Sequence, residues 1–246
     1  MEIDGRVALV TGAGAGAGRG IAHALAARGA IVAVADLDVE AGLATVTAIE
    51  AAGGRAGFVR VDMTVAAEVA GMIAYAGRLA GAGPHVLVNN AGGGGHVPPH
   101  FPEAEPAQWG ATLDLNLRGP MLATQICLEP MRRAGGGAVV NVASSAGLGL
   151  GAHPSPEYAA AKAGLIRLTA TLAGLAVVRV NCVVPDWILT ERAQADIARM
   201  TPAERAAAPV PIPVAEVAAG VLELIADDAL AGRVMVIDPG VPRRLL

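Results

Sequence analysis

Short apolar runs alternate with alanine-rich stretches along almost the whole chain, and this alternation limits the possible folds more than any other feature. The runs are continuous and rich in β-branched residues, which is typical of strands covered on both faces. We expect strands at residues 6–11, 30–36, 57–62, 85–90, 137–144, 177–184 and 233–238. We expect helices near residues 17–29, 39–53, 65–80, 106–133, 155–175 and 214–228. Strands that alternate with helices predict an α/β fold with a doubly wound, seven-stranded parallel sheet and helices on both faces.

The domain organisation follows from the same pattern. The chain has 246 residues and no linker, so we expect one domain over residues 1–246. Residues 186–213 break the alternation and end in a proline-rich stretch. A detour of this length from a compact core predicts a lid or a substrate-binding loop.

Composition excludes several classes of protein. Hydrophobic residues make up 54% of the chain and charged residues 16%, which suits a large core. The net charge of -4 argues against a nucleic-acid partner or an anionic membrane surface. We expect no secretory signal and no membrane span, since the start is acidic and no run of apolar residues is long enough. Cys127 and Cys182 lack CxxC spacing and are expected to be reduced core residues of a cytoplasmic protein.

Tyr158 and Lys162 are four residues apart in SPEYAAAKAG, a stretch whose alanines favour a helix. This spacing places both side chains on one helical face. One interpretation is a buried aromatic residue beside a lysine that reaches solvent. The other is chemical, because a cation about 4 Å from a tyrosinate stabilises it by about 4 kcal/mol at an effective dielectric constant of about 20. That energy would lower the pKa of Tyr158 from ~10 towards neutrality, as a general acid or base requires. We favour the chemical interpretation, because Lys162 and Arg167 are the only charged residues in the apolar stretch 159–178.

A glycine-rich segment, VTGAGAGAGRG at residues 10–20, lies between the first expected strand and the first expected helix. Glycines at such a turn let the backbone approach a pyrophosphate, which the amides of the helix N-terminus then bind. Asp36 ends the second expected strand, where an acidic residue hydrogen-bonds an adenosine ribose. The next residue, Leu37, offers no cation to a phosphorylated ribose. The segment therefore predicts a dinucleotide cofactor, and NAD rather than NADP.

Further motifs follow the expected strands in a fixed order. They are TGAGAGAG (11–18), NNAG (89–92), DLNLRG (114–119), NVASSAG (141–147), the Tyr158 and Lys162 pair, and PDWILT (185–190). Together they resemble the short-chain dehydrogenase/reductase family over essentially the whole chain. The resemblance implies a Rossmann-like single domain with a nicotinamide cofactor. The cofactor-binding residues that it implies are Gly12, Ala15, Gly16, Ala17, Gly18, Asp36, Leu37, Asp62, Met63, Asn90, Ala91, Gly92, Tyr158, Lys162, Pro185, Ile188 and Thr190.

The resemblance also implies catalytic roles. Tyr158 exchanges a proton with the substrate oxygen, and Lys162 lowers the pKa of Tyr158 and binds the nicotinamide ribose. Asn116 helps to order a water chain that leads to Lys162. Ser145 lies 13 residues before Tyr158, the usual interval in the family, and is expected to hydrogen-bond the substrate oxygen. Ser144 is one position off this interval and is expected to point the other way.

Several residues near these motifs have two interpretations each. Asp186 stands where the family has a glycine, and it is either a solvated loop residue or a contact to a polar substrate. His153 either edges the substrate pocket or is an ordinary loop residue, and Trp187 either walls that pocket or anchors the core. His96 and His100 are four residues apart, but the surrounding glycines and prolines exclude a helix, so no metal site is implied.

Two functional classes fit these observations. The first, which we favour, is an NAD(H)-dependent oxidoreductase that interconverts a secondary alcohol and a ketone. A 3-oxoacyl-thioester reductase is the alternative within this class, and Asp36 counts against it because the usual cofactor of that enzyme is NADPH. The second class is a dinucleotide-binding sensor or scaffold, although such a protein has little need of Asn116, Ser145, Tyr158 and Lys162 together. The helix expected at 155–175 has almost no polar face, so we expect a homotetramer, or a homodimer, that packs on it.

Overall fold

The computed structural model describes residues 1–79, 81 and 83–246, and eight strands in this part of the chain form one sheet. The strand order is β3-β2-β1-β4-β5-β6-β7-β8. The strands are β1 (Val7–Thr11), β2 (Ile31–Asp36), β3 (Arg55–Arg60), β4 (Val86–Asn89), β5 (Gly137–Val142), β6 (Val178–Pro185), β7 (Val234–Ile237) and β8 (Arg244–Leu245). The seven predicted strands pair in parallel, whereas β8 is a short antiparallel strand beside β7 that the sequence pattern did not predict.

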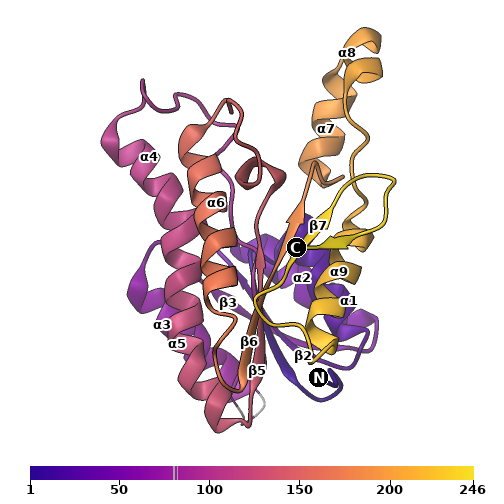
Figure 1. Ribbon diagram of the computed structural model, residues 1–246. Helices are drawn as coiled ribbons and strands as arrows, with labels where there is room; N and C mark the ends of the chain where they lie inside the picture. The colour runs from indigo at the N-terminus through magenta and orange to yellow at the C-terminus, as the bar shows by residue number, and fades with distance from the viewer. Residues whose placement is uncertain (80, 82) are drawn as a thin grey trace.

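Helices cover both faces of the sheet (Figure 1). They are α1 (Gly16–Ala26), α2 (Val39–Ala51), α3 (Ala66–Leu79), α4 (Pro106–Leu113), α5 (Gly119–Arg133), α6 (Pro156–Thr171), α7 (Glu191–Arg199), α8 (Pro202–Ala207) and α9 (Val214–Ala226). α1, α2 and α9 pack on one face, and α3, α5 and α6 pack on the other. The predicted α/β fold with a doubly wound sheet is confirmed.

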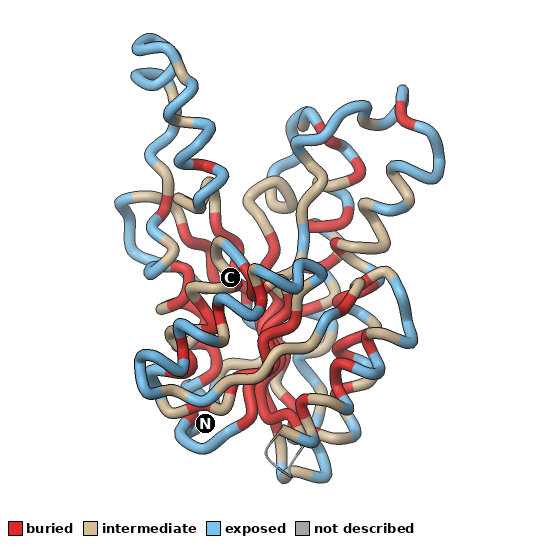
Figure 2. The backbone as a smooth tube through the Cα atoms, turned by 180° about the vertical axis from the view of Figure 1, so that it is seen from behind, coloured by how far each residue is buried: buried red, intermediate tan, exposed pale blue. Residues whose placement is uncertain are grey.

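The central strand β1 shows why its sequence is apolar without interruption. Val7 and Leu9 face the layer of α3 and α5, whereas Ala8 and Val10 face the layer of α1 and α9. All four side chains are fully buried, and the strands form the buried centre of the molecule (Figure 2). Successive residues of a strand point to opposite faces, so a strand covered on both faces needs apolar residues at every position.

The stretch 106–133, expected as one helix, is helical but changes its pitch. α4 passes into a π-helical turn, Asp114–Arg118, before α5 begins at Gly119. Pro120 has no amide hydrogen and cannot donate to the carbonyl group of Asn116, which weakens the regular α-helical ladder at this point. Turns of this kind occur often at functional sites, and this one carries Asn116.

Residues 186–213 are more regular than expected, because they contain α7 and α8. Thr190 caps α7 by accepting a hydrogen bond from the Ala193 amide at 3.3 Å. Thr201 and Glu204 form a capping box at the start of α8. We call this segment the α7–α8 arm; it projects beyond the sheet and is largely exposed (Figures 1 and 2). Within the described residues, no helix is both long enough and apolar enough to span a membrane.

Candidate active site

A groove of about 540 Å³ crosses the carboxyl ends of the central strands. It lies where the strand order reverses between β1 and β4, the place at which open α/β sheets bind ligands. Gly12 follows β1, Asp36 ends β2 and Asn90 follows β4, and all three line the groove. The fold therefore gathers at one edge the residues that follow different strands in the sequence.

The glycine loop after β1 leaves no room for a side chain at Gly12 or Gly18. A Cβ atom on Gly12 would lie 2.8 Å from the Cα atom of Ala91, and one on Gly18 would collide with the carbonyl oxygen of Gly12. Asn90 fastens the loop, because its side-chain amide donates to the carbonyl oxygens of Thr11 at 2.9 Å and of Gly12 at 3.1 Å. The N-terminal amides of α1 therefore reach the groove, an arrangement that binds phosphate anions.

Two carboxylates along the groove are held by backbone amides. The Asp36 carboxylate accepts hydrogen bonds from the amides of Gly14 at 2.7 Å and of Asp38 at 3.0 Å. The Asp62 carboxylate accepts from both the hydroxyl and the amide of Thr64, and these two bonds hold the pKa of Asp62 below its ordinary value. Both carboxylates thus have fixed positions from which they can meet a ligand.

Asn116 is buried in the π-helical turn and fixes the loop that follows β4. Its side-chain amide donates to the carbonyl oxygens of Gly93 at 2.8 Å and of Thr112 at 2.9 Å, and its oxygen accepts from the Gly93 amide at 3.0 Å. A Cβ atom on Gly92 would lie 2.7 Å from the Asn116 oxygen and 3.1 Å from Nζ of Lys162. The loop is therefore held close to both Asn116 and Lys162.

Tyr158 and Lys162 lie on one face of α6, and Nζ of Lys162 is 5.7 Å from the centre of the Tyr158 ring. Lys162 is buried and donates to the carbonyl oxygen of Val142 at 3.0 Å, and burial lowers the pKa of Lys162 to about 8. Burial also raises the pKa of Tyr158, against smaller opposing effects of the Ser144 side chain and the Arg192 charge. In this structure burial thus outweighs the effects that lower the Tyr158 pKa, and the expected effect of Lys162 on that pKa stays a prediction.

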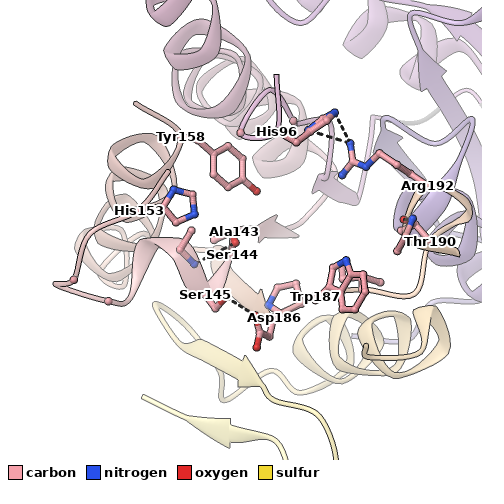
Figure 3. A pocket seen from close by; sticks show the side chains of 18 of the residues that line it. His96, Ala143, Ser144, Ser145, His153, Tyr158, Asp186, Trp187, Thr190 and Arg192 are labelled. Atoms are coloured by element: carbon pink, nitrogen blue, oxygen red, sulfur yellow. Dashed lines mark hydrogen bonds between the residues drawn. The ribbon is translucent and has the colours of Figure 1, made fainter. Parts of the chain in front are cut away.

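The two adjacent serines have different neighbours, although both line the same cavity. The side chain of Ser144 interacts with Tyr158, whereas the Ser145 hydroxyl donates to the Asp186 carboxylate at 2.8 Å (Figure 3). Ser144 lies beyond the end of β5 and caps the short 3-10 turn Ser145–Gly147, so the two side chains diverge where the strand becomes a turn. The interval of 13 residues spans a loop without a regular repeat, so it does not reveal which of the two serines lies nearer Tyr158, and the catalytic role of Ser145 stays a prediction.

A second cavity, of about 630 Å³, adjoins the groove, and Tyr158 lines both. Its walls come from the loops after β4 and β5, the end of β6 and the start of α7. The polar and aromatic side chains on these walls are His96, Ser144, Ser145, His153, Tyr158, Asp186, Trp187, Thr190 and Arg192 (Figure 3). Asp186, His153 and Trp187, which had two interpretations from sequence, thus all face this cavity.

Most of the predicted cofactor-binding residues line the groove: Gly12, Ala15, Gly16, Ala17, Asp36, Leu37, Asp62, Met63, Asn90, Ala91, Gly92, Tyr158, Lys162, Ile188 and Thr190. Gly18 and Pro185 do not. Gly18 packs beneath the loop against the Gly12 carbonyl group, and Pro185 lines the second cavity instead.

Sequence reasoning missed Glu191 and Arg192, although both directly follow Thr190, a residue that it placed in the site. The Glu191 carboxylate accepts the Gly16 amide at 3.0 Å and pairs with Arg19. This contact joins the α7–α8 arm to the glycine loop. A charged residue immediately after a predicted site threonine is a signal that could have identified both.

The two histidines with helix-like spacing do not share a site. Nδ1 of His100 lies 2.7 Å from the Glu157 carboxylate, whereas His96 contacts Arg192. In the part of the chain that the structure describes, no three His, Cys, Asp or Glu side chains converge on a point where a metal ion could bind.

Comparisons with known proteins agree with this architecture. Residues 6–200 match the family model for short chain dehydrogenases. D-beta-hydroxybutyrate dehydrogenase of Cupriavidus necator is 36% identical over 199 residues, which are 79% of this chain and 75% of the relative. Cis-4-hydroxycyclohexanecarboxylate dehydrogenase of Sinomonas cyclohexanicum is 36% identical over an alignment of 249 positions that covers 96% of this chain and 96% of the relative. A solved structure of 7 alpha-hydroxysteroid dehydrogenase complexed with NADH and 7-oxo glycochenodeoxycholic acid has a TM-score of 0.88 at 28% identity, covering 100% of this chain and 97% of that chain.

The fold, the groove at the switch point and these similarities define an α/β oxidoreductase. The chain belongs to the short-chain dehydrogenase family. Its named relatives are dehydrogenases that act on hydroxyl or ketone groups, and dehydrogenases of this family use a nicotinamide dinucleotide. The resemblance inferred from the sequence motifs is thus confirmed.

Proposed function

We propose that this protein is an NAD(H)-dependent oxidoreductase that interconverts a secondary alcohol and a ketone, with Tyr158 as the proton donor and acceptor. The observation that carries the proposal is the position of Tyr158, whose side chain lines both the groove and the second cavity. A cofactor in the groove and a substrate in the cavity would therefore meet beside its hydroxyl group. We accordingly call the second cavity the substrate cavity from here on.

The groove fits a dinucleotide. Gly12 and Gly18 leave the backbone of the loop open to a pyrophosphate, and the Asp36 carboxylate lies where an adenosine ribose would be hydrogen-bonded. Leu37 beside it is exposed, and within the described residues no cationic side chain forms an ion pair with Asp36. A ribose phosphate would meet an uncompensated carboxylate, so we expect NAD(H) to bind more tightly than NADP(H).

The raised pKa of Tyr158 suits proton donation to a ketone oxygen. At neutral pH the phenol keeps its proton and is ready to act as the general acid. When bound, the nicotinamide supplies or accepts the hydride. In the direction of alcohol oxidation Tyr158 must first lose its proton, so we expect oxidation to become faster as the pH rises and reduction to become slower.

Three further side chains assist Tyr158 in this proposal. Ser144 interacts with Tyr158 and would hydrogen-bond the same substrate oxygen, the role that we first expected of Ser145. Lys162, held by Val142, places an ammonium group beside the phenol and stabilises the tyrosinate as it forms. Asn116 orders the adjoining loop through Gly93.

We also propose that the protein assembles as a homotetramer or homodimer through α5 and α6. Met121 on α5 is exposed, and Leu128, Leu168 and Leu172 line an apolar hollow between these helices. Burial of such a surface against a second copy removes it from water. Analytical ultracentrifugation that shows a monomer at micromolar concentration would contradict this proposal.

The test of the activity combines binding with turnover. Calorimetric titrations of the protein with NADH and with NADPH should give the lower Kd for NADH. A panel of ketones is then offered with NADH, and loss of the reduced nicotinamide absorbance reports reduction. Equal or tighter binding of NADPH would contradict the cofactor assignment. NADH binding without turnover of any ketone in the panel would favour the dinucleotide sensor.

A further inference from the structure

Arg192 faces the substrate cavity from the start of α7, and the Tyr158 hydroxyl points into the same cavity from α6 (Figure 3). The charge of Arg192 also acts on the ionisation of Tyr158, which places the guanidinium within electrostatic range of the phenol. Arg192 is exposed rather than packed into the core. It also lines the groove, so it lies where the groove and the substrate cavity meet and can reach a substrate beside Tyr158.

Within the part of the chain that the structure describes, no carboxylate forms an ion pair with Arg192. Nη1 of Arg192 lies 3.3 Å and 3.1 Å from the two ring nitrogens of His96. Burial, assisted by Arg192, lowers the pKa of His96, so this imidazole is neutral at physiological pH and supplies no opposite charge.

The neighbouring acids on α7 have other partners. Glu191 pairs with Arg19 and accepts the Gly16 amide, and Asp196 pairs with Arg199. Arg192 itself is the second residue of α7, where the helix dipole disfavours a cation and favours an anion. An anionic group bound beside Arg192 would thus be stabilised by both the guanidinium and the helix.

The cavity is also lined by a carboxylate, that of Asp186. The Asp186 carboxylate accepts the Ser145 hydroxyl at 2.8 Å and shows this anionic face to the cavity (Figure 3). Two carboxylates repel each other, so an anionic ligand is steered away from Asp186 and towards Arg192. His153, the other histidine that lines the cavity, is hydrogen-bonded to the backbone of Ser155 and lies beside the Tyr158 ring.

We infer that Arg192 binds a carboxylate group of the substrate, so that the substrates of this protein are hydroxy acids and oxo acids rather than neutral alcohols and ketones. The inference rests on the proposed function, because it names the class of substrate for that same site. A planar guanidinium binds a carboxylate through two parallel hydrogen bonds, which fixes both the position and the orientation of the acid. The substrate oxygen is then presented to Tyr158 in a fixed orientation.

The test compares matched acids and esters. Acetoacetate and 4-oxocyclohexanecarboxylate, each beside its methyl ester, are reduced with NADH by the wild-type protein and by Arg192→Gln. Because Arg192 also acts on Tyr158, the readout is the ratio of kcat/KM for each acid to kcat/KM for its ester. We expect Arg192→Gln to lower this ratio by about 10- to 100-fold, as loss of a hydrogen-bonded charge predicts. Arg192→Lys keeps the positive charge but lacks the planar guanidinium group, so it should restore the acid-to-ester ratio only in part.

The control variant is Arg199→Gln, which removes an exposed arginine of the same helix that already pairs with Asp196. It should leave the acid-to-ester ratio unchanged. A wild-type protein that shows no preference for the acids would overturn the inference while the proposed function stands. An equal loss for acids and esters in Arg192→Gln, together with a higher Kd for NADH, would assign Arg192 to the cofactor and would also overturn it.

A binding measurement on the acid distinguishes a failure of this inference from a failure of the proposed function. Calorimetry of the NAD⁺-loaded protein with 4-oxocyclohexanecarboxylate measures binding without turnover, because oxidised cofactor has no hydride to donate, and Arg192→Gln should weaken this binding. If neither acids nor esters are reduced but the acid still binds through Arg192, the proposed function fails and the anion site remains. If the acid binds equally tightly to the wild type and to the variant, the inference that Arg192 binds the carboxylate is wrong, whether or not ketones are reduced.

Discussion

The cofactor groove is built from the ends of strands, whereas the substrate cavity is built from loops and the α7–α8 arm. Gly12, Asp36 and Asn90 directly follow or end β1, β2 and β4. On the side of the cavity, His96 and Arg192 come from a loop and from a helix that project beyond the sheet. The groove thus inherits its geometry from the sheet, while the cavity depends on segments that can change without disturbing the core.

The two regions also differ in how their charges are used. In the groove, the Asp36 and Asp62 carboxylates are occupied by amides or hydroxyls of nearby residues. In the cavity, Arg192 lacks an opposite charge among the described residues, and Asp186 has only the Ser145 hydroxyl. Carboxylates in fixed positions suit a cofactor that is the same in every turnover. The positive charge of Arg192, unpaired among the described residues, suits the selection of a substrate.

The largest expected effect on kcat/KM distinguishes Ser144 from Ser145, the two adjacent serines of the substrate cavity. Ser144→Ala removes a hydrogen-bond donor beside Tyr158, and we expect kcat/KM for ketone reduction to fall by about 100-fold or more. Ser145→Ala is the matched control, because Ser145 donates to Asp186 instead, and its effect should be much smaller. The reverse order of the two variants in steady-state assays would return the catalytic role to Ser145.

Lys162 lines the groove and is buried, and this burial should cost stability. The pKa of Lys162 falls from 10.5 to about 8 on folding. The Lys162 side chain therefore holds its proton more weakly in the folded protein than in the unfolded chain. Between these two pKa values the unfolded chain binds more protons than the folded one, and wild-type stability therefore rises with pH. The depressed pKa corresponds to a cost of about 3 kcal/mol at neutral pH.

Lys162→Met removes this charge. The free energy of unfolding of the variant at about pH 7 should exceed that of the wild type by up to about 3 kcal/mol, and the difference should shrink as the pH approaches the unfolded pKa. Urea unfolding at several pH values measures it. A difference that does not change with pH would show that the buried charge is not its source.

Asp36 tests the electrostatic selectivity of the groove. Asp36→Asn keeps an acceptor for the Gly14 amide but removes the charge. We expect the ratio of the Kd for NADPH to the Kd for NADH to fall by roughly tenfold, because a carboxylate no longer repels the ribose phosphate. Asp38→Asn carries the same chemical change two residues away and should leave the ratio nearly constant.

The smallest effect should come from Glu191, which joins the two regions. Its carboxylate accepts the Gly16 amide at the start of α1, where the cofactor pyrophosphate is expected. Glu191→Gln removes a competing negative charge, so the Kd for NADH should fall by about two- to fivefold. Glu216→Gln, at an exposed position on α9, should have no effect. Weaker NADH binding in Glu191→Gln would show that Glu191 supports the cofactor instead.

The same comparison explains how much could be predicted from the sequence. The seven parallel strands and the residues at their ends follow from periodicity and from turn chemistry, which are local properties. β8 has only two residues and forms only because it lies beside β7, so no local pattern marks it. The capping box of Thr201 and Glu204 is a local signal that could have identified α8.

On the substrate side, the direction of a side chain depends on tertiary contacts. Whether Ser144 or Ser145 faces Tyr158 is decided by the turn after β5 and by Asp186, which is 41 residues further along the chain. The raised pKa of Tyr158 likewise reflects burial, which a spacing of four residues does not reveal. Sequence spacing can therefore predict which side chains lie on one face of a helix, whereas their ionisation depends on the tertiary structure around them.

The most direct test of the account is a paired measurement on Tyr158→Phe. If Tyr158 transfers the proton to a substrate in the cavity while the groove binds the cofactor independently, the variant should lose nearly all NADH-dependent ketone reduction. Its Kd for NADH, measured by calorimetry, should stay within about twofold of the wild-type value, because the phenol hydroxyl serves the substrate oxygen. Substantial remaining turnover, or loss of NADH binding in a variant that is still folded, would contradict the central claim.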